Sequence, residues 1–176
     1  MRWLEIPIRP SNYNMDEERK QGFAPIFNAD SKVLILGSFP SVKSRQIQFY
    51  YGNKQNRFWK MICSYFGEEI PETVEGKIDF LLRRKIALWD MALSCEIEGS
   101  ADSSVRNVEL ADLSIILSKA RIEKILLNGT LAYELFMKGY ADTEIPYEKM
   151  PSTSPANPRY KEEVWRETLD GIFGVS

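Results

Sequence analysis

Histidine is absent from the sequence. Its absence excludes catalysis by Ser-His-Asp or Cys-His arrangements, and it excludes zinc sites built on histidine ligands. Cysteine is scarce, because Cys63 and Cys95 are the only thiols, too few for an iron–sulfur cluster. We expect both to be free core thiols of a reducing cytoplasm, with a disulfide as the alternative. The carboxylates are scattered along the chain, so we expect no metal and no other cofactor.

Long apolar runs are missing as well. None approaches the ~20 residues of a membrane span, and the N-terminus lacks the basic stretch and apolar segment of a signal peptide. We therefore expect a soluble, cytoplasmic protein. A strong net charge is also absent, since 23 basic residues nearly balance 25 acidic ones. This balance gives no support to tight non-specific binding of nucleic acid, but it does not exclude binding through a local patch.

The length of 176 residues fits one domain with a sizeable core, and 44% hydrophobic residues is ordinary for a globular protein. Alternating apolar character over residues 1–10 gives way to a charged run at 16–20. We interpret residues 1–22 as an N-terminal arm laid on a single domain that extends over residues 23–176.

Short apolar runs alternate with segments of helical periodicity after Lys32. We expect strands at 32–36, 85–90, 124–128 and 147–150, and helices at 56–67, 75–84, 108–120, 130–138 and 159–172. Gly, Ser and Asp enrich the segment 96–107, which predicts a long loop. Strands that alternate with helices favour a parallel sheet covered on both faces. The predicted fold class is therefore α/β, a three-layer α/β/α sandwich with a short, mainly parallel four-stranded sheet.

The most informative segment follows the first predicted strand. Gly-Ser-Phe-Pro-Ser at 37–41 indicates a tight loop at the carboxyl end of that strand, where ligands bind in open α/β sheets. Amides and aromatic rings then crowd the segment 46–57, a set that suits a flat, hydrogen-bonding ligand such as a nucleobase. Asp90 and the segment 151–157 also follow predicted strands, and a parallel sheet would place all of them at one edge.

Each of these residues has a structural alternative. Asn56 could serve only as a helix N-cap, where Asn is favoured. Phe39 and Tyr51 could be core aromatics. Asp90 could cap a turn or pair with Arg106, and the proline- and serine-rich segment could be a turn-rich connection.

Four motifs occur in order: Leu-Gly-Ser-Phe-Pro-Ser at 36–41, Tyr-Tyr-Gly-Asn-Lys-Gln-Asn-Arg-Phe-Trp at 50–59, Leu-Trp-Asp at 88–90 and Gly-Ser-Ala-Asp-Ser-Ser at 99–104. Together they resemble the uracil-DNA glycosylase superfamily, and most closely its hypoxanthine (deoxyinosine) DNA glycosylase branch. Pro-Ser-Thr-Ser-Pro-Ala-Asn at 151–157 stands where the second motif of the superfamily belongs. The resemblance extends from about Phe23 to the C-terminus and makes residues 23–176 the catalytic domain.

The chain departs from the superfamily pattern at three positions. Phe39 stands where most branches have a water-positioning Asn or Asp, and Ser152 replaces the His of the second motif. Lys54 stands where the hypoxanthine branch usually has Pro. Resemblance to the hypoxanthine branch implies that an Asn outside the first motif is catalytic. Asn56 is the first choice for this role, and Asn53 is the second.

The resemblance implies a monofunctional DNA glycosylase that hydrolyses the N-glycosidic bond of a deaminated base, hypoxanthine before uracil, after base flipping. Its partner is DNA, and we expect a monomer. Expected base-binding residues are Phe39, Tyr51, Asp90 and Ser38, and expected DNA-binding residues are Ser41, Ser152, Ser154 and Asn157. The alternatives are a catalytically inactive nucleic-acid-binding relative and a hydrolase of free nucleosides or nucleotides.

Overall fold

The computed structural model describes residues 19–96 and 106–174. Most of the predicted N-terminal arm at 1–22 lies outside this description, and so does the Gly-Ser-Ala-Asp-Ser-Ser motif at 99–104. The predicted loop at 96–107 also lies outside it, except for its two ends, which belong to strands. The described residues contain no helix that is long and apolar enough to cross a membrane.

The central sheet has four strands in the order β3 (Ile86–Asp90), β2 (Val33–Gly37), β6 (Lys124–Asn128) and β7 (Tyr147–Met150), and all neighbours are parallel. Apolar residues fill β2 and β3 because both faces of these strands are buried. The register pairs Gly37 with Asp90 and Asn128 with Met150. The strand ends that carry the predicted motifs therefore lie side by side.

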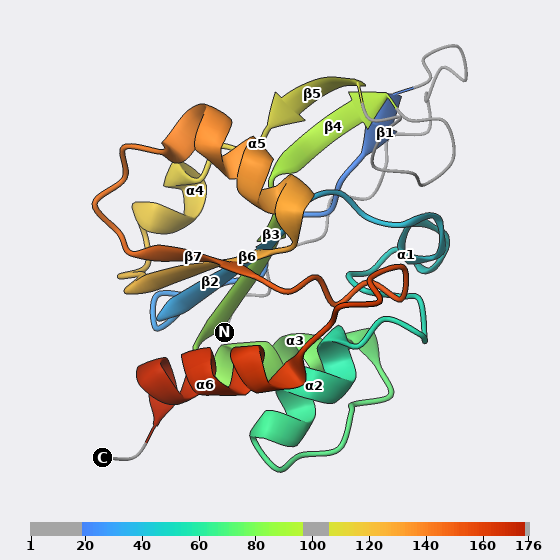
Figure 1. The fold of residues 1–176 in the computed structure, drawn as a ribbon, viewed down its shortest axis with the longest axis vertical. Coiled ribbons are helices and arrows are strands. Elements are labelled where there is room, and N and C mark those ends of the chain that lie inside the picture. Colours follow the sequence, from blue (N-terminus) through green and yellow to red (C-terminus); the bar gives the residue numbers. More distant parts are fainter. Residues whose placement is uncertain (1–18, 97–105, 175–176) are drawn as a thin grey trace.

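Helices cover both faces of this sheet (Figure 1). On one face lie α4 (Ser114–Leu117) and α5 (Thr130–Tyr140), and on the other lie α2 (Phe58–Tyr65), α3 (Val74–Arg83) and α6 (Glu162–Phe173). The predicted three-layer α/β/α fold with a four-stranded parallel sheet is confirmed.

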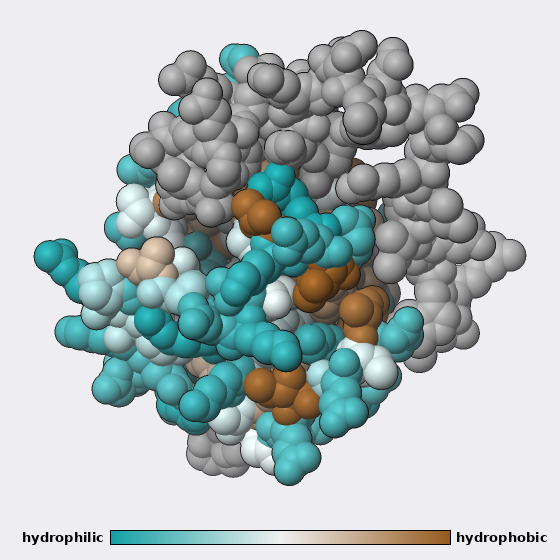
Figure 2. Space-filling view, turned by 90° about the vertical axis from the view of Figure 1, so that its right-hand side faces the viewer, coloured by the Kyte–Doolittle hydropathy of each residue, from teal (hydrophilic) through white to brown (hydrophobic). Residues whose placement is uncertain are grey.

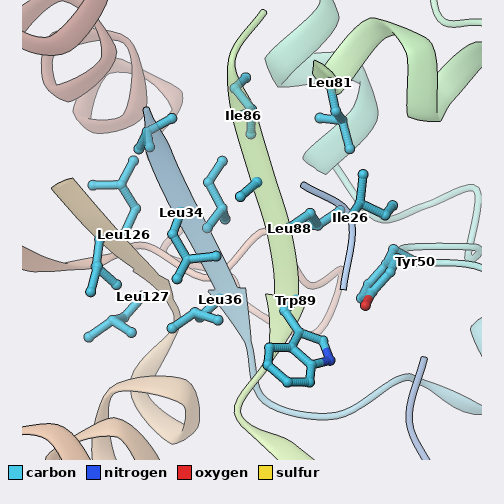
Figure 3. Close-up of a cluster of buried hydrophobic side chains, with 14 of the residues drawn as sticks. Ile26, Leu34, Leu36, Tyr50, Leu81, Ile86, Leu88, Trp89, Leu126 and Leu127 are labelled. Carbon is cyan, nitrogen blue, oxygen red and sulfur yellow. The ribbon is translucent and has the colours of Figure 1, made fainter. Parts of the chain in front are cut away.

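The core fills the space between the sheet and the helices. Figure 3 shows Leu34, Leu36 and Leu88 of the central strands among the buried side chains. Trp165 of α6 is fully buried, and its indole Nε1 donates to the carbonyl of Pro151 at 2.8 Å. The last helix is thus attached to the segment that follows β7, which fixes where that segment leaves the sheet.

A second, antiparallel sheet of β1 (Arg19–Gln21), β4 (Ala92–Glu96) and β5 (Arg106–Leu110) was not expected. The predicted helix at 108–120 is wrong in its first half, since residues up to Leu110 form β5 and only Ser114–Leu117 is helical. Residues 106–110 form a strand because they pair with β4, for example Leu110 with Ala92. The local periodicity of the sequence does not show this long-range pairing. The short helix α1 (Val42–Ile47) was not expected either.

Helix boundaries differ slightly from the predicted ones. The helix expected at 56–67 is α2, over residues 58–65, and the helix expected at 159–172 is α6, over residues 162–173. Cys63 of α2 is buried and free, as predicted, while the side chain of Cys95 is outside the described part of the chain.

Candidate functional site

A cavity of about 640 Å³ opens where the four parallel strands end. Its floor includes Gly37 of β2, Asp90 of β3, Asn128 of β6 and Met150 of β7, the last residue of each strand. Figure 1 shows the strands pointing toward the side that holds α1 and the segment after β7. Figure 2 shows the face on that side, where hydrophilic side chains predominate and apolar ones are scattered.

All ten residues that the sequence analysis assigned to a site line this one cavity. They are Ser38, Phe39, Ser41, Tyr51, Asn53, Asn56, Asp90, Ser152, Ser154 and Asn157. The sequence predicted only that the segments 37–57 and 151–157 and Asp90 lie at the same edge of the sheet. The structure shows that they line the same cavity. Their individual roles depend on the contacts described next.

Asp90 is the only acidic residue among the described residues that line the cavity, and its side chain is buried. Burial raises its pKa to about 7. None of the described residues donates a hydrogen bond to its carboxylate. The side chain lies against Gly37, where a Cβ would collide with Oδ1 of Asp90 and approach the hydroxyl of Tyr51 to 3.0 Å. Glycine at position 37 thus leaves room for the carboxylate, which faces the cavity with its acceptor oxygens unused by described residues.

Tyr51 forms one wall of the cavity beside Asp90. Its ring stacks on the buried ring of Phe58 with a centroid distance of 4.2 Å and an interplanar angle of 28°, which fixes the position of this wall. Burial and the nearby Asp90 raise the pKa of the phenol well above its usual value. Tyr51 therefore stays protonated and keeps a hydroxyl proton to donate.

Asn56 lies one residue before Arg57, the N-cap of α2, so it is not the helix cap that its sequence position allowed. Its Oδ1 instead accepts a hydrogen bond from the backbone N–H of Phe58 at 2.9 Å, two residues on, as in a turn that leads into a helix. Its Nδ2 has no partner among the described residues, and the residue lines the cavity. The amide oxygen thus fixes the side chain, while the amide N–H groups remain available for a ligand.

Asn53 supports the same loop. Its Oδ1 accepts from the backbone N–H of Gln55 at 3.0 Å, and its carbonyl accepts from the N–H of Asn56 at 2.8 Å. These bonds keep Asn53 and Asn56 in a tight turn at the cavity wall.

The loop of residues 152–157 is held by its own side chains. The hydroxyl oxygens of Ser152 and Ser154 accept from the backbone N–H groups of Ser154 and Ala156, both at 3.2 Å. Asn157 Nδ2 donates to the carbonyl of Ser152 at 2.9 Å. These bonds occupy oxygen lone pairs and leave both hydroxyl protons of the serines available to donate.

The other wall follows β2. Ser41 is the N-cap of α1: its Oγ accepts from the N–H of Ser44 at 3.1 Å, and its hydroxyl bonds that of Ser44 at 3.1 Å. The Ser41 hydroxyl is therefore already engaged within the protein. Phe39 is half-buried, with the Arg45 guanidinium 5.7 Å from its ring centroid. The carbonyl of Ser38 accepts from the N–H of Ala92 at 2.9 Å and so joins this wall to β4.

Asn128 was not predicted as a site residue. It ends β6 and is 8% exposed. Its Nδ2 donates to the hydroxyls of Tyr51 and Thr153, each at 3.0 Å, and its Oδ1 accepts from the N–H of Thr153 at 3.0 Å. The buried amide thereby joins the aromatic wall to the 152–157 loop. A polar residue directly after an apolar strand is the signal that identified Asp90, and the same signal marks Asn128.

Comparison with known families bears on this site. A family described as the uracil DNA glycosylase superfamily matches residues 24–169. The chain belongs to the uracil-DNA glycosylase superfamily. The resemblance inferred from the motifs is thereby confirmed.

Two curated relatives of this superfamily member carry the name hypoxanthine DNA glycosylase. The protein of Methanosarcina acetivorans is 34% identical over 154 residues, which cover 83% of this chain and 95% of the relative. The protein of Methanosarcina barkeri is 33% identical over 147 residues, which cover 80% and 90%. A solution NMR structure from Methanosarcina acetivorans, described as a candidate uracil DNA glycosylase, is 32% identical with a TM-score of 0.74, covering 88% of this chain and 98% of that one.

Proposed function

We propose that this protein hydrolyses the N-glycosidic bond of hypoxanthine in DNA and leaves an abasic site. Membership of the superfamily and the names of the two relatives support a DNA glycosylase for a deaminated base. The observation that carries the choice of base is the buried carboxylate of Asp90 in the cavity wall, to which no described residue donates a hydrogen bond.

Asp90 distinguishes hypoxanthine from adenine by the proton on N1. Hypoxanthine carries N1–H, which an ionised carboxylate accepts, whereas N1 of adenine is itself an acceptor. A site that leaves a buried polar group unpaired rejects the wrong ligand strongly. Uracil presents N3–H and satisfies the same acceptor, so it is the second candidate base.

The chemistry requires that the base leave the duplex stack and enter the cavity. As the C1′–N9 bond breaks, the sugar gains oxocarbenium character and the bonding electron pair moves to the base. Water then attacks C1′, its oxygen forms the new C1′–O bond, and the proton it loses is taken up by the anion of the departed base. Asn56 orients this water or donates its Nδ2 hydrogen to the departing base, a contribution that grows as charge develops. Asn53 is the second choice for this role, and Tyr51 and Phe39 stack on the base.

The serine-rich loop binds the DNA strand beside the extruded nucleotide. Ser152 and Ser154 donate their hydroxyl protons to phosphate oxygens, and Ser41 joins them when its bond to Ser44 is exchanged for one to phosphate. Asn157, together with Pro155 and Ala156, fills the gap left in the stack. Ser38 contributes hydrogen bonds to the base.

One copy of the chain suffices for this reaction, because every residue assigned a role lines a cavity formed within a single chain. We therefore expect the protein to act as a monomer. The buried free thiol Cys63 fits the reducing cytoplasm in which we expect it to work.

A gel assay tests the proposal. A labelled duplex with one deoxyinosine is incubated with the protein, and abasic sites are cleaved with alkali. We expect strand breakage at the deoxyinosine and none in an undamaged duplex. Binding without breakage would instead indicate an inactive nucleic-acid-binding relative, and release of hypoxanthine from free inosine but not from DNA would indicate a nucleoside hydrolase.

A further inference from the structure

The cavity wall has a charge distribution unlike that of the whole chain. Among the lining residues that the structure describes, only Asp90, Lys149 and Arg159 carry formal charges, and Asp90 is buried. Lys149 and Arg159 are exposed. The whole chain has 25 acidic and 23 basic residues, yet the exposed part of this wall carries two cations and no carboxylate. An incoming ligand therefore meets positive charge at the rim.

Lys149 makes no ion pair with any residue in the described part of the chain. Its Nζ lies 6.0 Å from the ring centroid of Tyr133 on α5. Its neighbour in β7, Glu148, points to the opposite side of the strand and pairs with Lys124 at 3.3 Å. Glu148 of β7 therefore neutralises Lys124 on the side away from the cavity, whereas Lys149 at the rim has no acidic partner among the described residues.

Arg159 shows the same contrast with a nearby arginine. The guanidinium of Arg57 donates two hydrogen bonds to the carbonyl of Asn157, each at 3.2 Å, and lies 4.6 Å from the ring centroid of Tyr160. That guanidinium is occupied in holding the loop. The side chain of Arg159 makes no hydrogen bond or ion pair with a described residue.

The two free cations bracket the 152–157 loop. Lys149 precedes the loop and lies on the side of α5, as its contact with Tyr133 shows. Arg159 follows Asn157, which Arg57 holds at the start of α2. Figure 1 shows α5 and α2 on opposite faces of the sheet, so the loop runs from a residue in contact with α5 to a residue held at the start of α2.

We propose that Lys149 and Arg159 form a two-point clamp for DNA backbone phosphates on either side of the extruded nucleotide. The inference rests on the proposed function, since it takes DNA as the ligand. The serines of the loop supply only neutral donors, whereas these cations release counterions from the DNA when they bind it. Arg159 can donate two parallel hydrogen bonds to one phosphate, whereas Lys149 attracts a phosphate as a point charge.

The salt dependence of DNA binding tests the clamp. Fluorescence anisotropy with a labelled, undamaged duplex compares the wild type with Lys149→Gln, Arg159→Gln and the double variant over a salt series. The slope of log affinity against log salt should fall by about one for each single variant and about two for the double variant. Affinity at low salt should fall about three- to tenfold per residue.

Lys119→Gln and Arg121→Gln are matched controls. Both residues are exposed, neither forms an ion pair with a described residue, and they precede the amino end of β6, at the opposite edge of the sheet from the cavity. Each control removes the same charge and should leave the slope unchanged. Slopes of the cavity variants equal to those of the controls would overturn the clamp.

Single-turnover cleavage of the deoxyinosine duplex gives a second readout. The clamp predicts a higher enzyme concentration at half-maximal rate, with the maximal rate within about twofold of wild type. A reduced maximal rate with an unchanged salt slope would mean that the residues act in the chemical step, and the clamp would be wrong. If the wild type fails to cleave deoxyinosine while the slopes still fall as predicted, the proposed function fails and the clamp stands.

Discussion

The side-chain amide of Asn128 donates a hydrogen bond to the phenolic oxygen of Tyr51 at 3.0 Å, although the two residues lie 77 positions apart in the chain. The same amide bonds both the N–H and the hydroxyl of Thr153. Asn128 itself does not have to touch the base. Its bonds set the distance between the Tyr51 ring, which we propose stacks on the base, and the 152–157 loop, which we propose binds the DNA strand.

Replacing this amide should affect stability and rate together. Asn128→Leu leaves the N–H of Thr153 and the hydroxyl of Tyr51 buried without their partner, so unfolding free energy should fall by about 2–3 kcal/mol. The maximal cleavage rate should fall at least about tenfold, as expected when a reacting group is displaced. Urea unfolding and single-turnover cleavage measure the two effects. Tyr51→Phe is the control, because it removes one of these bonds and keeps the ring; we expect a loss of about 1 kcal/mol. A folded Asn128→Leu protein with wild-type rate would contradict the positioning role.

Asn56 allows its two roles to be separated by a pair of variants. Asn56→Ala removes both the oxygen that accepts from the N–H of Phe58 and the free amide. We expect a loss of about 1 kcal/mol of stability and a decrease of about two orders of magnitude or more in cleavage rate. Asn56→Asp keeps an oxygen for the N–H of Phe58 but lacks the amide donor, so its melting temperature should match that of the wild type while its cleavage rate falls. If both variants cleave at nearly wild-type rate, Asn56 only holds the turn before α2.

The choice of base depends on Asp90 in our proposal. Asp90→Asn replaces the carboxylate, which only accepts, by an amide that can present its own N–H toward N1 of the base. This N–H opposes the N1–H of hypoxanthine, so cleavage of deoxyinosine should fall more than binding to undamaged DNA. The preference for deoxyinosine over deoxyadenosine should shrink with it. Competition between the two substrates in one reaction measures this preference directly. A fully folded variant with unchanged preference would remove Asp90 from base recognition.

The raised pKa of Asp90 also makes stability depend on pH. In the unfolded chain the carboxyl ionises near its usual value of 3.8, whereas in the folded protein it ionises at about 7. The stabilising effect of the neutral form is therefore complete below about pH 4 and is lost as pH rises toward 7. At about 1.4 kcal/mol per pKa unit, the loss amounts to a few kcal/mol. Urea unfolding of the wild type and of Asp90→Asn at pH 4 and pH 8 measures this effect. Raising the pH from 4 to 8 should lower the unfolding free energy of the wild type more than that of the variant.

Cleavage should have the opposite dependence on pH. The ionised carboxylate accepts the N1–H of hypoxanthine more strongly than the neutral carboxyl does, so the rate should rise as pH increases through about 7. Stability and activity thus change in opposite directions over the same range. A rate that is flat across this range would argue against an ionised Asp90 in the reacting complex.

The rule for parallel strands explains why much of the site could be predicted. Asp90 follows an apolar run, the segment 151–157 follows the weaker strand predicted at 147–150, and the sheet places both at its carboxyl edge. Asn128 follows the run Ile125-Leu126-Leu127 in the same way, so the sequence contains its signal as well. What the sequence does not contain is the network of Asn128, because its partners Tyr51 and Thr153 become neighbours only after folding.

Two features depend on tertiary structure more completely. The segment up to Leu110 has helical spacing with Leu113 and Ile116, yet pairing with β4 makes it a strand. Lys149 and Arg159 resemble every other surface cation in the sequence. Only the folded chain shows that Lys124 is neutralised by Glu148, whereas the two cations at the rim have no acidic partner among the described residues.

The bonds between Arg57 and the 152–157 loop have a consequence for biosynthesis. The N–H of Arg57 donates to the carbonyl of Thr153 at 3.1 Å, and its guanidinium reaches Asn157. A nascent chain that has folded β2, β3 and β6 therefore has the proposed catalytic amide and carboxylate but no wall to hold a strand against them. We therefore expect chains truncated before β7 and its loop to show no cleavage of the deoxyinosine duplex, because they lack this wall of the cavity.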